Sequence, residues 1–195
     1  EDGSGNVITL SNTTSDDFMA DNSALSGMTS DFVLSSMSAN GYELNWSYYF
    51  QGKDVVATGL DINLTTGILV VVGHGTDFNH TPDKIHGSQL AGTTDHDAFV
   101  STFDVNTGSL IKFAIYAGTD DDFGTDVKFD ENGDLVIIGY TNSDNTSEGF
   151  DVSFPAQQPS LSGIGDRYDA FIAKISSTLN TKMWSTYMGG DLDDA

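Results

Sequence analysis

The chain has 195 residues, no cysteine, 21 Gly, only 3 Pro and a formal net charge of −22 at pH 7. Without cysteine it forms no disulfide, offers no thiolate to a metal and has no thiol nucleophile. Its 29 Asp and Glu against 7 Lys and Arg repel phosphate backbones, so we expect no nucleic-acid partner. No apolar run approaches the ~20 residues of a membrane helix, so we expect no membrane insertion. The chain begins at Glu1, and we interpret it as a mature or trimmed chain.

Short runs of β-forming residues follow glycine turns along the chain. Such runs begin at Gly5, Gly67 and Gly133. Asn132-Gly133 is a two-residue hairpin signal, because both residues tolerate the positive φ of tight turns. The long polar stretches 76–97 and 141–168 are predicted to be loops. In the last unit we predict strands at Thr125–Asp130, Asp134–Tyr140, Ala170–Ile175 and Lys182–Met188.

These strands belong to a repeat. An Asp-Phe or Asp-Ala-Phe step recurs 67 and 72 residues apart, with its phenylalanine at Phe32, Phe99 and Phe171. Further along each unit, an aromatic residue is followed three positions later by Tyr and then by Gly, in the segments beginning at Trp46, Phe113 and Trp184. Landmarks that recur in one order indicate repeated structural units. We place the units at approximately 1–52, 53–118 and 119–190, with three, four and four strands.

Four antiparallel strands per repeat are the make-up of a propeller blade. We therefore predict an all-β fold of four-stranded β-propeller blades, about three in number, forming a partial propeller within one repeat region. Three blades do not close a propeller, so we expect the chain to be part of a longer one or to be completed by a neighbouring subunit. Contacts that do not close on themselves would build a filament.

The units also resemble a known family. Residues 169–194 read Asp-Ala-Phe-Ile-Ala-Lys, then Trp-Ser-Thr-Tyr-Met-Gly-Gly and an acidic cluster, and residues 118–143 continue through a strand, Asn-Gly and Gly-Tyr-Thr-Asn-Ser. This pattern resembles the SBBP repeat, the seven-bladed β-propeller repeat of surface proteins. Residues 31–78 depart from it, with Gln51-Gly52 in place of Gly-Gly and Gly73-His-Gly in place of Gly-Tyr-Thr. The resemblance implies a propeller and a surface location, and it carries over no catalytic motif.

Five Asn-x-Ser/Thr sequons predict N-linked glycosylation, at Asn12, Asn45, Asn63, Asn79 and Asn145. About two to three sequons are expected by chance at this composition. The alternative is therefore a bacterial chain in which the sequons are unused.

Two acidic clusters follow the glycine after the last strand of a unit. They comprise Asp120, Asp121 and Asp122 in one unit and Asp191, Asp193 and Asp194 in the next. Ca²⁺ binds several carboxylate and carbonyl oxygens, so these loops are candidate Ca²⁺ sites, and we expect no other cofactor. The alternative is that the carboxylates accept hydrogen bonds from the amides of their own turns.

The repeated aromatic residues and the histidines have structural interpretations. Because the aromatics recur at fixed positions, we predict that they pack between blades and do not form a sugar-stacking platform. Three of the four histidines, His80, His86 and His96, lie in the predicted loop 76–97. Their spacing fits no usual metal signature, so we interpret them as surface-loop residues.

These features favour a non-enzymatic module. We expect a structural or adhesive part of an extracellular or cell-surface assembly (a filament, sheath or appendage) that contacts itself or other extracellular subunits. The alternative is a glycan-binding or glycan-cleaving propeller domain. Cleavage would need paired carboxylates from different blades at one site.

Overall fold

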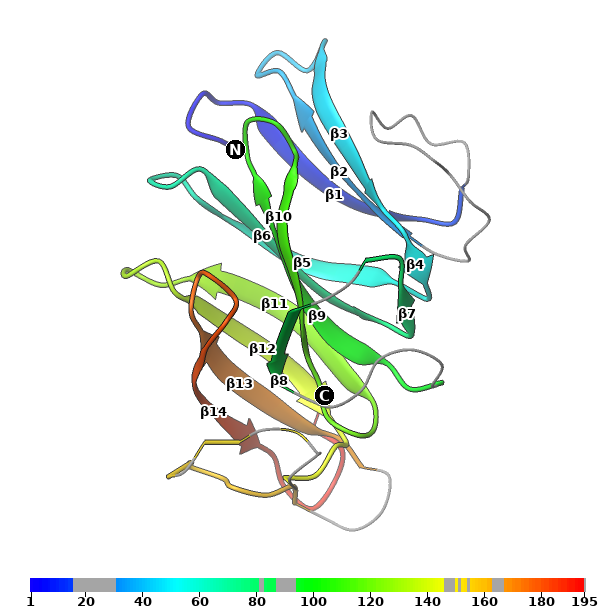
Figure 1. Cartoon of the computed structure of the whole chain (residues 1–195), viewed down its shortest axis with the longest axis vertical. Coiled ribbons are helices and arrows are strands. Elements are labelled where there is room, and N and C mark those ends of the chain that lie inside the picture. Colours follow the sequence, from blue (N-terminus) through cyan, green and yellow to red (C-terminus); the bar gives the residue numbers. More distant parts are fainter. Residues whose placement is uncertain are drawn as a thin grey trace.

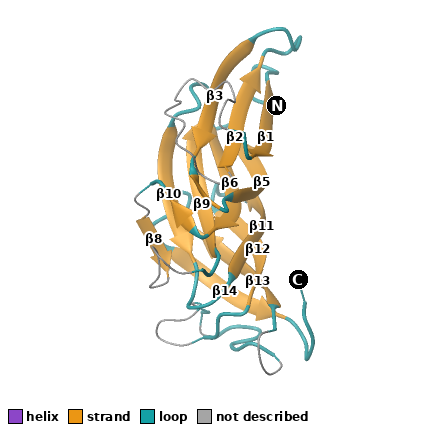
Figure 2. Ribbon diagram, turned by 90° about the vertical axis from the view of Figure 1, so that its right-hand side faces the viewer, coloured by secondary structure: helices purple, strands orange, loops and turns teal. Residues whose placement is uncertain are grey.

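The computed structural model describes residues 1–15, 31–80, 83–86, 94–145, 150, 152–153, 155–162 and 167–194. Over these residues the chain forms β-strands and no helix, so the all-β prediction is confirmed. Three twisted sheets lie one after another along the long axis of the molecule (Figure 1), and the view from the side shows their strands nearly edge-on (Figure 2). They are consecutive blades of a partial propeller.

Each predicted unit forms one blade. Blade 1 has the order β1-β2-β3, with β1 at Val7–Thr13, β2 at Asp31–Met37 and β3 at Leu44–Phe50. Blade 2 has the order β5-β6-β9-β10, with strands at Val56–Asn63, Ile68–Gly75, Asp97–Asp104 and Leu110–Tyr116. Blade 3 has the order β11-β12-β13-β14, with strands at Asp122–Phe129, Leu135–Thr141, Asp169–Ile175 and Lys182–Met188.

Three short strands lie outside the predicted pattern. β8 (Asp83–His86) adds to the outer edge of blade 2 by pairing in parallel with β10. β4 (Gly52–Lys53) pairs with β7 (Asp77–Phe78) in a separate two-stranded sheet. The stretch 76–97 is therefore not purely a loop, because its backbone groups find partners on the strand edges beside it.

The hairpin at Gly133 is longer than two residues. Phe129 pairs with Leu135, and the backbone N–H of Asp130 donates to the carbonyl of Asp134 over 2.8 Å. Three residues therefore make the turn, with Gly133 at φ +83°. The sequence located the turn correctly, but the neighbouring aspartates extended the loop beyond the tight type.

The register corrects the alignment of the phenylalanines. Asp31, Asp97 and Asp169 each pair with the last residue of the preceding long strand, so these aspartates are equivalent. Phe32 directly follows its aspartate, whereas Phe99 lies one position further on. Since successive strand residues point to opposite faces, the two rings point in opposite directions.

This register gives every blade two faces. Face A is the side of a blade that carries Leu69, Val71 and Phe99 in blade 2, and Leu135, Ile137 and Phe171 in blade 3. Face B carries Ile8, Leu10 and Leu34 in blade 1, Val70, Val72 and Val100 in blade 2, and Val136, Ile138 and Ile172 in blade 3. Register pairing places the members of each set at equivalent positions.

Face B of one blade packs on face A of the next. Between blades 1 and 2, Phe32 stacks on Phe99 with ring centroids 5.7 Å apart. Between blades 2 and 3, Val72 and Val100 share a buried cluster with Ile137. Full burial of such side chains contributes about 1.5–3 kcal/mol each. Repeated packing of one kind therefore holds the three blades together.

Candidate functional site

The first acidic cluster spans the end of the loop that follows β10 and the first residue of β11, Asp122. The backbone N–H of Gly118 donates to Oδ2 of Asp122 over 2.6 Å. The backbone of His96 is bound from both sides, because its N–H donates to Oδ1 of Asp121 over 2.8 Å and its carbonyl accepts from the N–H of Asp122 over 2.6 Å. These carboxylates tie the loop that leaves one blade to the start of β9.

The second acidic cluster repeats this arrangement. Gly190 N–H donates to Oδ2 of Asp194 over 2.6 Å. Tyr168 N–H donates to Oδ1 of Asp193 over 3.2 Å, and the N–H of Asp194 donates to the carbonyl of Tyr168 over 2.8 Å. Asp193 and Asp194 are thus equivalent to Asp121 and Asp122. Asp191 is exposed.

Backbone N–H groups therefore already bind several of the carboxylate oxygens that were predicted to bind Ca²⁺. Asp120, the remaining member, is exposed, and its N–H donates to Oγ of Ser143 over 2.9 Å. Within the described ranges, no group of three or more His, Asp or Glu side chains is arranged to hold a metal ion. Binding of Ca²⁺ to these loops stays a prediction.

Asp122 is the most deeply buried acid of the clusters. Its side chain is fully buried, and it accepts hydrogen bonds from the hydroxyls of Thr141 and Ser143, both in blade 3. Burial, helped by the nearby charge of Asp97, raises the pKa of Asp122 to about 8 against the opposing effect of these hydrogen bonds. Sequence reasoning gave all three aspartates of this cluster the same role, because burial is not visible in an Asp-Asp-Asp run.

Histidines and aromatic rings join blades 2 and 3 beside this loop. His74 in β6 lies edge-on to His96 and Phe123, at centroid distances of 5.6 and 4.7 Å. Nδ1 of His96 lies 3.3 Å from Oδ1 of Asp121, and the hydroxyl of Tyr168 donates to the other oxygen over 3.0 Å. Desolvation lowers the pKa of His74 to about 4, so this ring is neutral at pH 7. The contact is structural, and His96 is not the simple surface-loop residue that the sequence predicted.

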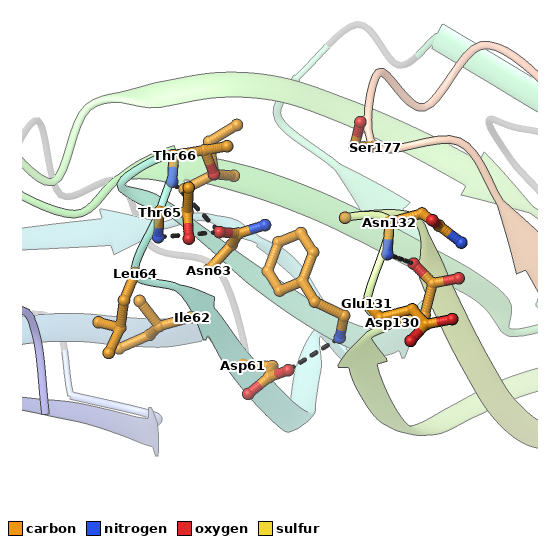
Figure 3. A pocket seen from close by; sticks show the side chains of 13 residues that line it. Asp61, Ile62, Asn63, Leu64, Thr65, Thr66, Asp130, Glu131, Asn132 and Ser177 are labelled. Atoms are coloured by element: carbon orange, nitrogen blue, oxygen red, sulfur yellow. Dashed lines mark hydrogen bonds between the residues drawn. The ribbon is translucent and has the colours of Figure 1, made fainter.

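The hairpins at the opposite end of blades 2 and 3 flank a cleft of about 450 Å³ (Figure 3). Asp61 and Asn63 from blade 2 face Asp130 and Glu131 from blade 3 across it, and Phe129 also lines the cleft. Oδ2 of Asp61 accepts the backbone N–H of Phe129 over 2.8 Å, which joins the two blades. A hydrogen bond from Lys174 lowers the pKa of Asp130, the opposite of what a general acid needs.

The sequons differ in how their side-chain amides are used. Asn12 is bound twice to the backbone of Ala57 in β5, with Nδ2 to the carbonyl and Oδ1 from the N–H, both at 2.8 Å. Nδ2 of Asn145 donates to the carbonyl of Pro159 over 2.8 Å. Nδ2 of Asn45 and Asn79 donates to the side chains of Ser36 and Gln51. A glycan on Asn12 would push against blade 2, so this sequon is the poorest acceptor.

The side-chain amide of Asn63 is held by its own turn. Its Oδ1 accepts the backbone N–H groups of Thr65 and Thr66, at 3.0 and 3.2 Å, and these bonds fix the amide group. Figure 3 shows its nitrogen pointing away from these bonds, toward the cleft. A glycan on Asn63 would therefore extend over the cleft.

The repeated aromatics are core residues with one exception. Tyr49, Tyr116 and Tyr187 are all buried, as are Trp46 and Phe113. Trp184, however, is 41% exposed, although it pairs with the sixth residue of the neighbouring strand, Lys174, as Trp46 pairs with the sixth residue, Ser36, in blade 1. Trp46 is covered by blade 2, whereas no described residue covers the same position on blade 3.

Face B of blade 3 is an open apolar surface on the described part of the chain. Ile138 is 44% and Met188 57% exposed, while the equivalent Val72 in blade 2 is 1% exposed. A shallow cavity of about 520 Å³ lies on this face, lined by Thr125, Ile138, Gly139, Tyr140, Ala170, Phe171, Ile172, Met188 and Asp194. Sequence reasoning missed this site, since its residues read as ordinary strand positions.

Fold and surface together define a stack of propeller-type blades with one open apolar face. Neither a known protein family nor a curated protein matches the chain. Among solved structures, a protein of unknown function from Bacteroides caccae is 9% identical, with 80% of this chain and 77% of that chain covered and a TM-score of 0.21. A superposition of this quality does not establish a shared fold. None of the described segments forms a helix long and apolar enough to cross a membrane.

Proposed function

We propose that the chain is a non-enzymatic structural or adhesive module of an extracellular surface assembly, and that face B of blade 3 is its contact surface. The observation that carries this proposal is the exposure of Ile138 and Met188, because the equivalent residues of blade 2, Val72 and Tyr116, are each 1% exposed. Contiguous apolar patches on a protein surface mark interaction sites. Burial of this face would stabilise an assembly as it stabilises the blade stack.

Three features support an extracellular setting for this module. The repeat resembles one from surface proteins. Five sequons are present, and the side-chain nitrogen of Asn63 points toward the cleft while its oxygen is bound within its own turn. The charge of −22 keeps such a chain soluble outside its assembly. Ca²⁺ at the acidic loops would lower the repulsion between subunits, and this belongs to the same proposal.

The experiment separates the surface, secreted and intracellular fractions of the producing cells and sizes the chain in each. We expect the chain in the surface fraction, in particles much larger than 20.8 kDa. The double variant Ile138→Asp and Met188→Asp should release it as a small soluble species. Ile111→Asp is the matched control, because Ile111 is 57% exposed on a strand of blade 2. A chain confined to the cell interior, or released equally by the control, contradicts the proposal.

The cleft between the hairpins favours glycan binding as a second candidate. It combines carboxylates and amides from two blades with an aromatic side chain, Phe129, and such mixtures bind neutral sugars through hydrogen bonds and stacking. Binding suits this site better than cleavage, because Asp130 has a lowered pKa and Asp61 is bound to the backbone. Calorimetric titration with neutral oligosaccharides tests it. Loss of binding in Glu131→Gln, with unchanged stability, would support the cleft as the site.

A further inference from the structure

We infer that face B of blade 3 docks a fourth β-blade, distinct from the three in this chain. This blade must have an apolar face A and a hairpin glycine opposite Trp184. The inference deepens the proposed function, because it names the partner of the same face. Two sets of contacts inside the molecule define what the partner must present.

The first requirement is an apolar face A, and it follows from the two interfaces already present. In both, aliphatic side chains of a face B meet the aliphatic and aromatic side chains of the next face A, as in the clusters around Leu69 and Ile137. On blade 3, Ile138 and Ile172 occupy the positions of Val72 and Val100. The same chemistry is displayed, and the cavity of about 520 Å³ between these side chains is open to receive it.

The second requirement comes from the tryptophans. Trp46 on face B of blade 1 lies over the hairpin of blade 2, where its Nε1–H donates to the carbonyl of Val105 over 3.1 Å. A Cβ on Gly108, at φ +69°, would overlap the indole ring, so only glycine allows this contact. Trp184 is the equivalent residue of blade 3. A partner blade must therefore place a glycine and a free carbonyl in its outer hairpin beneath Trp184.

A second copy of the chain does not meet these requirements. The face that it would present is face A of blade 1, where Thr9 takes the place of Val71. The apolar residues of that face, Val33 and Tyr49, are already 1% and 3% exposed within the chain. Two copies would also bring together charges of −22. Head-to-tail stacking of copies is therefore disfavoured against a separate blade.

The test extends the full chain with a blade of the required chemistry. A second copy of residues 123–194 is joined after Asp194, so that Asp194 takes the place of Asp122. The copy carries two substitutions, Leu179→Gly to make room for the indole and Trp184→Lys. Trp46→Phe in every chain compared then leaves the original Trp184 as the only tryptophan. Leu179 is chosen because it has the positive φ of the hairpin, +53°. Acrylamide quenching of tryptophan fluorescence measures the exposure of Trp184.

We expect quenching of Trp184 to fall about sevenfold in the extended chain, from the 41% exposure of Trp184 to the 6% of Trp46, with emission at shorter wavelength. Ile138→Asp in the original blade 3 should restore the quenching. Unchanged quenching overturns the inference, whether the added blade folds or not, because a complementary face would template it. A dimer of the unextended chain in sedimentation, abolished by Ile138→Asp, also overturns it by identifying a second copy as the occupant. The quenching and sedimentation results do not depend on where the chain is found in the cell fractionation, so this inference and the proposed function can fail separately.

Discussion

Replacement of Asp122 by asparagine tests whether a buried, protonated carboxyl group controls the pH dependence of stability. The pKa of this group is about 8 in the folded chain and 3.8 ordinarily. Between these values the folded state holds a proton that the unfolded state has lost, so the contribution of Asp122 to stability decreases as pH rises toward 8. His74, whose pKa falls from 6.5 to about 4 on folding, acts in the opposite sense below pH 6.5. The effect of Asp122 is therefore least obscured between pH 6.5 and 8.

The size of the effect follows from the width of that window. One unit of differential protonation is worth about 1.4 kcal/mol, so the free energy of unfolding should decrease by about 1–2 kcal/mol from pH 6.5 to 8. Urea unfolding at each pH, followed by circular dichroism, measures it. Asp122→Asn should remove the slope whatever its effect on absolute stability, and the exposed Asp120→Asn is the control. A level profile for the unsubstituted chain would show that the three hydrogen-bond donors keep Asp122 ionised and would refute the reasoning.

Three further predictions concern the interfaces between blades. As pH falls from 6.5 to 4.5, His74→Gln should gain about 1 kcal/mol of stability relative to the unsubstituted chain, after allowance for solvent screening, because the unfolded state no longer takes up a proton at residue 74. Coinciding stability profiles of the variant and the unsubstituted chain in the same urea series would contradict this. Gly108→Ala should cost about 1–3 kcal/mol more than Gly67→Ala, since both glycines have φ +69° but only the first lies against an indole ring; equal urea midpoints would exclude the close contact. Phe171→Ala should cost about 3–5 kcal/mol because its ring is 2% exposed, whereas Met188→Ala on the open face should change the unfolding free energy by less than about 0.5 kcal/mol; a large effect of the methionine change would show that its face is already covered.

Much of the fold could be predicted from local sequence. Runs of β-branched and aliphatic residues ending at Gly or Asn predict strands and turns without reference to the rest of the chain. The strand Lys182–Met188 has the predicted bounds, and the units contain three, four and four blade strands as expected. The turn at Gly133 and the burial of the three repeated tyrosines follow from the same local signals. The short strands β4, β7 and β8 were missed, because they arise from tertiary pairing: β8 pairs with the edge strand β10, and β4 and β7 pair with each other.

Which face each side chain occupies was decided only by the tertiary structure. Phe32 and Phe99 look equivalent in the sequence, but the pairing of Asp31 and Asp97 sets them one position apart, and a shift of one residue reverses the face. Trp46 and Trp184 occupy equivalent positions, yet one is buried and the other exposed. A sequence repeat determines which side chains a blade presents to its neighbour. Burial depends on whether that neighbour is present, and this is a property of the assembled stack.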